Sequence, residues 1–424
     1  MKHKIYLDCT HTYNSGLNTG IQRVVKNICK NIPEVSKKLD LEIVSVVLKE
    51  QRYYRFTDFP EINNTNNKLK TKLKYFYIKV RELLPNFISN YLHSPSLTTR
   101  LNKLTDKVLF HKSIADDNIV NIEKEDILFL IDTTWLNNNY TLLEELKTKK
   151  VKIMVLIYDI IPITHHQFCT QDLTNSLSHW YKNILPYIDS YIAISHAVKD
   201  EVYHYIETNY NKEIRYKNFD AFHLGSDFNL KSIENVSILD DFKKIFSSYD
   251  TYLTVSTIEP RKNHTYILDT FESLWEQGID VKYVMIGKIG WESDEFIQRV
   301  KTHKEFNKKL FLLTEVNDME LVYAYKNSKS LVFASYTEGF GLPIIESLHH
   351  NLQVLCSDIQ VHREIGKEFV TYFDLDDKDS LLSIIKTDDF NKNLKEFKSW
   401  SWKESTEDLM QKVLKQWQVI ESEA

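Results

Sequence analysis

Residues 330–346 read SLVFASYTEGFGLPIIE, which is a short apolar run, a glycine-containing turn and the beginning of a helix. The apolar run ends near Ser335, and Pro343 suits the first turn of a helix. A strand–turn–helix unit of this kind is typical of parallel sheets covered by helices, which bind ligands at the carboxyl ends of their strands. We therefore expect Glu338 and Glu346 near that edge, with Glu346 about one turn into the helix.

The same turn predicts a site for an anion. Backbone N–H groups of residues 339–341 and of the helix start would point into one crevice, where the helix dipole favours negative charge. Two carboxylates beside such a cradle suit a ligand that has both hydroxyls and phosphates. Taken alone, Glu346 is equally explained as an acid favoured by the start of a helix.

The alternation of apolar runs and amphipathic segments continues through most of the chain. This pattern favours parallel sheets with covering helices, and ten or so strands are better divided between two doubly wound sheets than placed in one. We predict strands at 4–8, 41–47, 127–131, 151–159, 190–195, 251–256, 282–287, 310–313, 331–335 and 352–357, a further strand ending at Leu224, and helices at 21–32, 263–277, 317–327 and 402–419.

Composition excludes several classes of protein. The chain has 424 residues, of which 42% are hydrophobic and 27% charged, as in globular proteins with ample core. Its four cysteines lie far apart without a CxxC pair, which argues against a disulfide framework or a zinc site. A net charge of −5 does not indicate the overall basic surface that is typical of nucleic-acid-binding proteins. The apolar runs are too short to span a membrane, and residues 1–8 do not resemble a signal peptide.

Glycine is scarce and unevenly placed. The chain has nine glycines, whereas an average chain of this length has about thirty. Dilution by other residues explains the number but not the positions, because six of the nine fall in three loop pairs: Gly16 and Gly20, Gly287 and Gly290, and Gly339 and Gly341.

A polar break near residues 225–250 suggests the domain organisation. We expect a first Rossmann-like domain over residues 1–228, a second over 229–400, and a C-terminal helix over 401–424. The first domain carries an insertion at about 66–112 that is basic and aromatic, with ten Lys or Arg against two acids between residues 68 and 112. Two interpretations stay open: the insertion docks on anionic lipid headgroups, or it packs on its own domain with solvated lysines.

A second stretch, LTVSTIEPRKNH at residues 253–264, carries adjacent cations where a strand runs into a turn. Arg261 and Lys262 in that position could neutralise a diphosphate leaving group. Asn263 is placed to cap the helix that follows. An isolated Arg-Lys pair is usually surface charge, so the functional interpretation depends on the acidic stretch described above.

Together these residues resemble the retaining nucleotide-sugar glycosyltransferases of family 4, which have the GT-B fold. The motif EPRKN at residues 259–263 is most similar to the corresponding motif of bacterial mannosyltransferases that build O-antigen or related polysaccharides. The resemblance implies two Rossmann-like doubly wound parallel-sheet domains facing across a cleft, with a C-terminal helix that crosses back to the first domain. It covers nearly the whole chain outside the insertion, and it includes TGIQRV at 19–24, YDIIP at 158–162, IAIS at 192–195, HLGSD at 223–227 and WSW at 400–402.

The resemblance also implies roles for individual residues. Lys262 would contact the donor diphosphate with Arg261 as its partner, and Glu338 would hold the donor sugar's hydroxyls. Glu346 would accept hydrogen bonds from the ribose. The remaining donor contacts implied are the backbone amides of Gly339, Phe340, Gly341 and Leu342, Gly287 and Lys288 near the base, Thr257 on the donor side, and Gly20 in a loop facing the diphosphate.

Two departures from the family pattern bear on the site. Many members have Gly-Arg where this chain has Ser-Thr257, so one phosphate-binding arginine is missing and Arg261 is its candidate replacement. Relatives often have a histidine where this chain has Tyr158. The histidines at 165 and 166 either compensate or are surface residues. Asp159 is expected to face the donor or the acceptor, and the alternative is that it caps a helix or a turn.

The function implied is transfer of a hexose with retention, with mannose from GDP-mannose as the expected donor. The acceptor would be a growing bacterial surface glycan or a lipid-linked oligosaccharide, reached from the cytoplasm or the inner face of its membrane. We expect no cofactor and no obligatory metal. Three alternatives stay open: a non-catalytic glycan-binding or scaffolding subunit, a transferase using a UDP-linked or deoxyhexose donor, and a glycoside hydrolase with two carboxylates.

Overall fold

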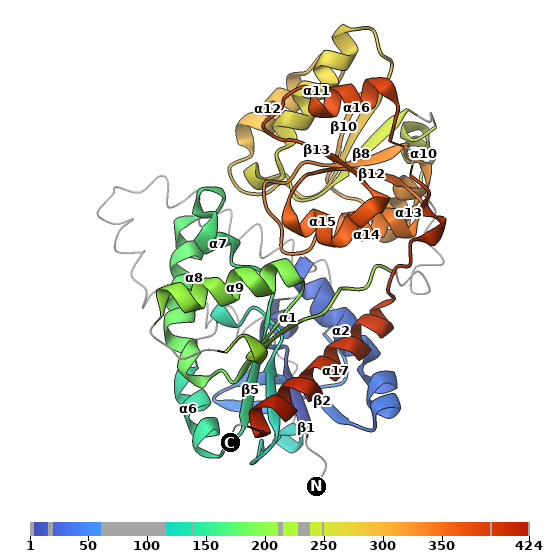
Figure 1. Cartoon of the computed structure of the whole chain (residues 1–424). Coiled ribbons are helices and arrows are strands. Elements are labelled where there is room, and N and C mark those ends of the chain that lie inside the picture. The colour runs from blue at the N-terminus through green and yellow to red at the C-terminus, as the bar shows by residue number, and fades with distance from the viewer. Residues whose placement is uncertain are drawn as a thin grey trace, which may run out of the picture. The chain divides into compact units, whose positions relative to one another are not determined.

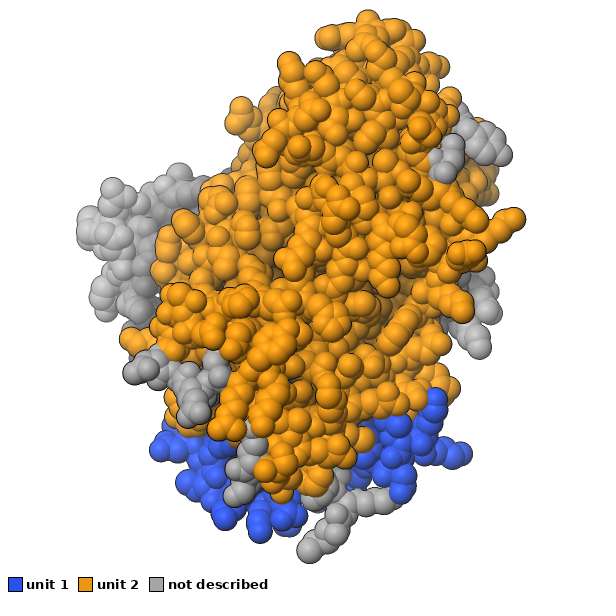
Figure 2. Space-filling view, viewed as in Figure 1, with its two compact units in different colours: residues 1–30, 36–152 blue, residues 31–35, 153–424 orange. Residues whose placement is uncertain are grey.

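The structure is a computed structural model, and it describes residues 4–15, 20–60, 116–136, 139–210, 215–227, 238–247, 250–390 and 392–422 (Figure 1). The basic insertion predicted at 66–112, together with Gly16, lies outside the described residues. The chain forms two compact units (Figure 2). Unit 1 comprises Met1–Lys30 and Ser36–Lys152, and unit 2 comprises Asn31–Val35 and Ile153–Ala424.

The first sheet has seven strands in the order β3-β2-β1-β4-β5-β6-β7. Strand β1 pairs in parallel with β2 and β4, and β6 pairs in parallel with β5 and β7, while β2 and β3 are antiparallel. The strands are β1 (Lys4–Asp8), β2 (Glu42–Lys49), β3 (Arg52–Arg55), β4 (Ile127–Leu130), β5 (Lys152–Ile157), β6 (Ser190–Ala193) and β7 (Phe219–Ala221).

Helices alternate with these strands along the chain: α1 (Thr10–Ser15), α2 (Gly20–Leu39), α6 (Tyr140–Thr148), α7 (Ile161–Thr164), α8 (Gln171–Ile184) and α9 (His196–Asn209). The end predicted for α2 is wrong, because the helix continues past Pro33 to Leu39. Proline removes one helical hydrogen bond at a cost of roughly 3 kcal/mol. The apolar side chains on either side of it, Ile32 and Val35, are buried, so their packing offsets that cost.

The second sheet lies in unit 2 and has six strands in the order β10-β9-β8-β11-β12-β13, all paired in parallel. Helices cover both faces: α11, α12 and α16 lie on one side, and α13, α14 and α15 on the other (Figure 1). The strands are β8 (Thr251–Val255), β9 (Lys282–Ile286), β10 (Leu310–Leu313), β11 (Ser330–Phe333), β12 (Gln353–Ser357) and β13 (Thr371–Phe373). The helices are α10 (Asp240–Ile245), α11 (His264–Glu276), α12 (Asp294–Thr302), α13 (Asp318–Asn327), α14 (Leu342–His349), α15 (Gln360–Gly366) and α16 (Ser380–Thr387).

Buried aromatic side chains form part of the core of this second sheet. Phe271 of α11 stacks on Tyr283 of β9, with ring centroids 4.8 Å apart, and both side chains are fully buried. Stacked aromatic pairs add roughly 0.5–1.5 kcal/mol to the gain from burial. The packing fixes α11 on the sheet, and the helix start therefore stays at the carboxyl end of β8.

The prediction of two doubly wound parallel sheets is confirmed, and the ten predicted strands are present within two residues of their expected bounds. The strand expected to end at Leu224 is β7, which ends at Ala221. Strands β3 and β13 were not predicted, because each has only three or four residues and their alternation is too short to recognise. The boundary predicted at residue 228 stays a prediction.

The C-terminal helix α17 (Trp402–Glu421) returns to the first sheet, as the fold class implies. The hydroxyl of Ser190 on β6 donates to Oε1 of Gln416 at 2.8 Å. Nζ of Lys415 lies 2.7 Å from a carboxylate oxygen of Asp220 on β7. None of the described helices is both long and apolar enough to cross a lipid bilayer.

Candidate functional site

A buried ion cluster lies at the carboxyl ends of β8 and β11. Oε2 of Glu338 accepts a hydrogen bond from Nη1 of Arg261 at 3.0 Å, and Oε1 accepts one from Nζ of Lys262. The hydroxyl of Ser335 also donates to Oε1, at 2.6 Å. The side chain of Glu338 is 8% exposed, and those of Arg261 and Lys262 are 17% and 11% exposed. The sequence-predicted acid and cations are therefore in direct contact.

Arg261 is held by further bonds that fix its guanidinium. Nη1 also donates to the carbonyl of Thr337 at 2.7 Å, and Nη2 donates to Oε1 of Glu259 at 2.8 Å. The backbone N–H of Tyr336 donates to the carbonyl of Arg261 at 3.0 Å. The turn after β8 and the turn after β11 are thus joined by both main-chain and side-chain bonds. This joining orients the cations before any ligand arrives.

Mutual charge decides the protonation of the cluster. Burial alone would raise the pKa of Glu338, but the charges of Lys262 and Arg261 hold that pKa well below its usual range. Burial opposes the charge of Arg261, yet Glu338 and Glu259 raise its pKa above the usual value. Burial and the neighbouring Arg261 lower the pKa of Lys262, while Glu338 opposes that shift. Glu338 and Arg261 consequently stay charged at neutral pH.

Asp159 lies beside this cluster, in the loop after β5. Burial raises the pKa of its carboxyl, while the charges of Arg261 and Lys262 act in the opposite direction and Glu338 adds to the increase. Its Oδ1 accepts a hydrogen bond from the N–H of Ile161 at 3.1 Å, which is a turn-capping bond. The structure therefore shows the turn-capping role of Asp159 and its electrostatic contact with the ion cluster, whereas its orientation toward a donor or an acceptor stays a prediction.

Gly339 and Gly341 allow the loop after β11, which carries Glu338, to adopt its backbone conformation. A Cβ atom on Gly339 would come within 2.3 Å of the carbonyl oxygen of Tyr158, closer than any real contact. The carbonyl of Gly339 accepts a hydrogen bond from the hydroxyl of Ser195 at 2.8 Å. Gly341 has φ of +96°, a conformation that side chains disfavour. The loop that carries Glu338 therefore needs glycine at both positions.

Helix α14 follows, and it confirms the predicted place of Pro343 in its first turn. Glu346 lies one turn inside and is only 2% exposed. Its Oε2 accepts a hydrogen bond from the hydroxyl of Tyr325 on α13 at 2.8 Å. Tyr325 was not singled out from the sequence, since a tyrosine on an amphipathic helix gives no signal of such a contact.

The loops after β8 and β9 pair with each other. The N–H of Ile258 donates to the carbonyl of Lys288, and the N–H of Gly290 donates to the carbonyl of Ile258, both at 2.9 Å. A Cβ atom on Gly287 would meet the carbonyl oxygen of Ser256 at 1.8 Å, so the two backbones pass too closely for any other residue. The side chains of Thr257 and Lys288 are exposed. Their proposed contacts with a donor stay predictions.

The capping role predicted for Asn263 is wrong. The residue occupies the N-cap position of α11, but its side chain makes no capping hydrogen bond. Its backbone is left-handed with φ of 53°, whereas a capping residue usually has an extended backbone that brings its side chain over the first turn.

Two buried histidines support the loops without having been predicted. Nε2 of His264 lies 3.0 Å from the hydroxyl of Ser256, and burial lowers the pKa of His264 to about 4. Nδ1 of His362 donates to the carbonyl of Ser357 at 2.8 Å, and burial lowers its pKa to about 4 as well. Both imidazoles are therefore neutral. A single histidine in an apolar context carries no sequence signal for this role.

The remaining predicted residues are further from this arrangement or belong to the other unit. His165 follows α7, where burial and the charge of Arg261 lower its pKa, so this histidine is within electrostatic reach of the ion cluster. Gly20 is the first residue of α2, in unit 1. Its role toward a diphosphate stays a prediction.

The part of the chain that contains the ion cluster of Glu338 is similar to a known protein family. Residues 238–395 match the family described as glycosyl transferases group 1. This segment is a group 1 glycosyltransferase domain. It contains Arg261, Lys262, Glu338 and Glu346, whereas Asp159 lies before it. The ion cluster is thus a feature of the group 1 domain, and the neighbouring carboxylate is contributed from outside it.

Two mannosyltransferases are similar to a larger or comparable part of the chain. The serotype-specific mannosyltransferase WbdA of Escherichia coli is 30% identical over 271 residues, which cover 62% of this chain and 33% of WbdA. The O-antigen chain mannosyltransferase B of Escherichia coli is 28% identical over 185 residues, covering 41% of this chain and 47% of that protein. The chain therefore matches between a third and a half of the length of these relatives.

A solved structure supports the fold of the whole chain. HepE of Anabaena, crystallised in complex with UDP and glucose, aligns over 99% of both chains with a TM-score of 0.51 and 12% sequence identity. At this identity the likeness concerns the fold alone. The group 1 domain is accordingly part of a GT-B fold made from two parallel-sheet α/β parts.

Proposed function

We propose that the protein is a glycosyltransferase that moves a hexose, mannose from GDP-mannose, to a growing glycan with retention of anomeric configuration. The observation that carries the proposal is the contact of Glu338 with Arg261 and Lys262 inside a group 1 domain. The names of the two Escherichia coli relatives, both mannosyltransferases, support mannose as the sugar.

The cluster suggests how a donor would bind. A diphosphate entering the site would compete with Glu338 for Arg261 and Lys262, because both cations now bind its carboxylate. The carboxylate, freed in part, would accept hydrogen bonds from sugar hydroxyls. Backbone amides of Gly339, Phe340, Gly341 and Leu342 would add donors at the start of α14.

The remaining donor contacts complete the proposed subsite. Glu346, held by Tyr325, would accept hydrogen bonds from the ribose. Gly287 and Lys288 would lie near the base, with Thr257 on the same side. Arg261 would replace the arginine that this chain lacks beside Ser256.

The chemistry follows from charge. As the glycosidic bond to the diphosphate breaks, negative charge grows on the leaving phosphate and positive charge on the anomeric carbon. Fixed cations at the leaving group lower that barrier without reorganising. Arg261 and Lys262 are the residues proposed for this role, so the reaction needs no metal or cofactor. Asp159 would face the reacting sugar or the acceptor hydroxyl.

The acceptor we propose is a bacterial surface glycan or a lipid-linked oligosaccharide, as the O-antigen name of one relative suggests. Such acceptors are assembled at the inner face of the cytoplasmic membrane, where we place the reaction. The basic segment 68–112 would provide a peripheral contact with anionic lipid.

A panel of nucleotides tests the donor. Thermal unfolding of the purified full chain is followed with GDP, GDP-mannose, UDP and UDP-glucose, since a ligand at a hundredfold excess over its Kd stabilises by about 2.7 kcal/mol. We expect a shift with GDP and GDP-mannose, and its loss in Lys262→Ala but not in Lys308→Ala, which removes an exposed lysine. A shift with UDP compounds alone would make the GDP-mannose assignment wrong.

Catalysis is tested separately from binding. Donors of the panel are incubated with the protein and released nucleotide is measured, with and without lipid-linked acceptor. No release from any donor would favour the non-catalytic alternative. Full transfer by Lys262→Ala would contradict the role given to the ion cluster.

A further inference from the structure

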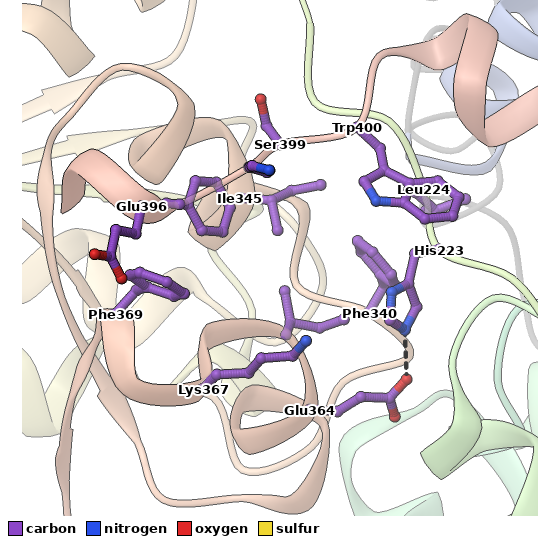
Figure 3. Close-up of a pocket in the computed structure, with 13 residues that line it drawn as sticks. His223, Leu224, Phe340, Ile345, Glu364, Lys367, Phe369, Glu396, Ser399 and Trp400 are labelled. Carbon is purple, nitrogen blue, oxygen red and sulfur yellow. Dashed lines mark hydrogen bonds and ion pairs between the residues drawn. The ribbon is translucent and has the colours of Figure 1, made fainter.

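Three side chains from separate elements of unit 2 meet beside the loop of Gly339. They are His196 at the start of α9, His223 after β7, and Glu364 of α15, and their ligating atoms all lie within 4.8 Å of one another. Nε2 of His223 is 2.9 Å from Oε1 of Glu364. Figure 3 shows His223 and Glu364 pointing toward each other from different parts of the chain. Two imidazoles and a carboxylate are a donor set used by zinc sites with an open position.

The carboxylate is already oriented. The backbone N–H of His196 donates to Oε1 of Glu364 and that of Ala197 donates to Oε2, each at 2.8 Å. These bonds use one lone pair on each oxygen and leave others for a further ligand. Hydrogen bonds of this kind fix metal-ligating carboxylates in known sites and strengthen metal binding.

The ring of His223 is oriented as well. Its backbone carbonyl accepts a hydrogen bond from the hydroxyl of Ser405 at 2.7 Å. The ring packs edge-on against Phe340 and Trp400, with centroids 6.0 and 6.4 Å away. His196 is exposed, and its ring lies edge-on to that of His223 with centroids 5.9 Å apart. One ligand can therefore move onto an ion that the other two hold.

The surroundings suit a cation with bound water. A cavity of about 250 Å³ is lined by His223 and Glu364 together with Phe340, Lys367 and Trp400 (Figure 3). Asp408 of α17 lies within electrostatic reach of both histidines; burial raises the pKa of its carboxyl, while Lys412 and the two histidines lower it. Water from the cavity can fill the coordination positions that the protein leaves open.

We propose that His196, His223 and Glu364 bind one divalent transition-metal ion, with zinc the ion best suited to this donor set. Ligands at roughly 2.0–2.2 Å from a tetrahedral zinc lie roughly 3.4 Å apart. The donor atoms here all lie within 4.8 Å of one another, so binding an ion requires them to approach by at most about 1.4 Å. The bond between His223 and Glu364 is then replaced by two bonds to the metal.

Such an ion has a structural role. It joins α9, the segment after β7 and α15, and it lies next to the bond from Ser195 to the carbonyl of Gly339. Glu338 and its two cations are not among the ligands, so the ion takes no part in the proposed transfer chemistry. Its effect is to hold the loop that carries Glu338.

Calorimetry with zinc tests the site on the untagged full chain after treatment with a chelator. We expect one zinc ion per chain, and cobalt in its place should give the visible absorption of a nitrogen- and oxygen-liganded ion. His196→Ala should weaken zinc binding by about tenfold or more, because loss of an oriented ligand costs at least as much as loss of its support. His204→Ala removes an exposed histidine of the same helix and should leave the affinity unchanged.

Thermal unfolding provides a second readout that does not depend on activity. Zinc should raise the melting temperature of the wild type and of His204→Ala, and raise that of His196→Ala much less. Because His196 is exposed, its replacement should not impair folding, which circular dichroism checks. Absence of zinc binding by the wild type, or equal affinity in His196→Ala, would overturn the proposal.

Discussion

The hydroxyl of Tyr325 donates a 2.8 Å hydrogen bond to the carboxylate of Glu346, and both side chains are buried. The bond joins α13 to α14 and fixes one oxygen of an acid proposed to hold the donor ribose. A carboxylate that is already oriented loses less entropy when it binds a hydroxyl. Tyr325 therefore acts on the donor through Glu346.

The first prediction concerns this bond. Tyr325→Phe should raise the KM for the donor by about three- to tenfold, equivalent to roughly 1 kcal/mol of binding, with little change in kcat. The ring stays in place, so only the hydrogen bond is lost. Tyr323→Phe, two residues earlier on the same helix, is the control and should behave as the wild type. A fall in kcat with unchanged KM would contradict this role for Tyr325.

A second prediction separates the two functions given to the ion cluster. Glu338→Gln should lower transfer by about a hundredfold, because the carboxylate proposed to accept hydrogen bonds from the sugar hydroxyls no longer positions the sugar. The same change releases Arg261 and Lys262 from a competing carboxylate, so a free nucleoside diphosphate should bind at least as tightly as to the wild type. Isothermal titration and a transfer assay measure the two effects.

The matched control for this prediction is Glu315→Gln, which removes an exposed carboxylate from a loop of the same domain. If Glu338→Gln instead weakened binding of the nucleoside diphosphate strongly, competition between Glu338 and the phosphates would be excluded.

A third prediction tests the close approach at Gly339. In Gly339→Ala the new methyl would lie 2.3 Å from the carbonyl oxygen of Tyr158, so the loop must move. We expect a loss of stability of about 1–3 kcal/mol, the usual cost of overpacking, and a lower melting temperature. Gly20→Ala, whose methyl would meet no atom within 4 Å, should not lower it. Equal melting temperatures for both variants would show that the loop is not confined.

The fourth prediction concerns acid stability. Burial lowers the pKa of His362 from 6.5 to about 4, so between these values the unfolded chain binds a proton that the folded chain does not. The free energy of unfolding therefore falls as pH decreases through this window. One pKa unit corresponds to about 1.4 kcal/mol, so His362 accounts for at most about 3.5 kcal/mol of this loss.

His362→Leu removes that contribution. The melting temperature of the variant should therefore fall less steeply than that of the wild type as the pH decreases from 6.5 to about 4.5, a window that lies between the unfolded and folded pKa values of His362. His204→Leu, at an exposed position, should retain the wild-type slope. Identical slopes for wild type and His362→Leu would mean that His362 is not held neutral by the fold.

Much of the fold is already present in the local pattern of the sequence. Apolar runs of four to six residues, each followed by a turn and an amphipathic segment, identified the strands and helices of both sheets. Two stretches, at residues 253–264 and 330–346, resemble the glycosyltransferase family, and this resemblance predicted the acid and the cations of the site. The sequence pattern did not predict strand β3 or the continuation of α2 past Pro33, because both depend on partners that are distant in the sequence.

What the sequence determined by itself is which residues form each strand, turn and helix, since periodicity and turn chemistry are local properties. Tertiary structure decided which turns meet. Glu338 and Arg261 are 77 residues apart, and they bond because β8 lies beside β11 in the sheet. The contacts of Tyr325 with Glu346 and of His223 with Glu364 have the same origin. Strand order and helix packing are set by long-range burial of apolar surface, which no local stretch of sequence records.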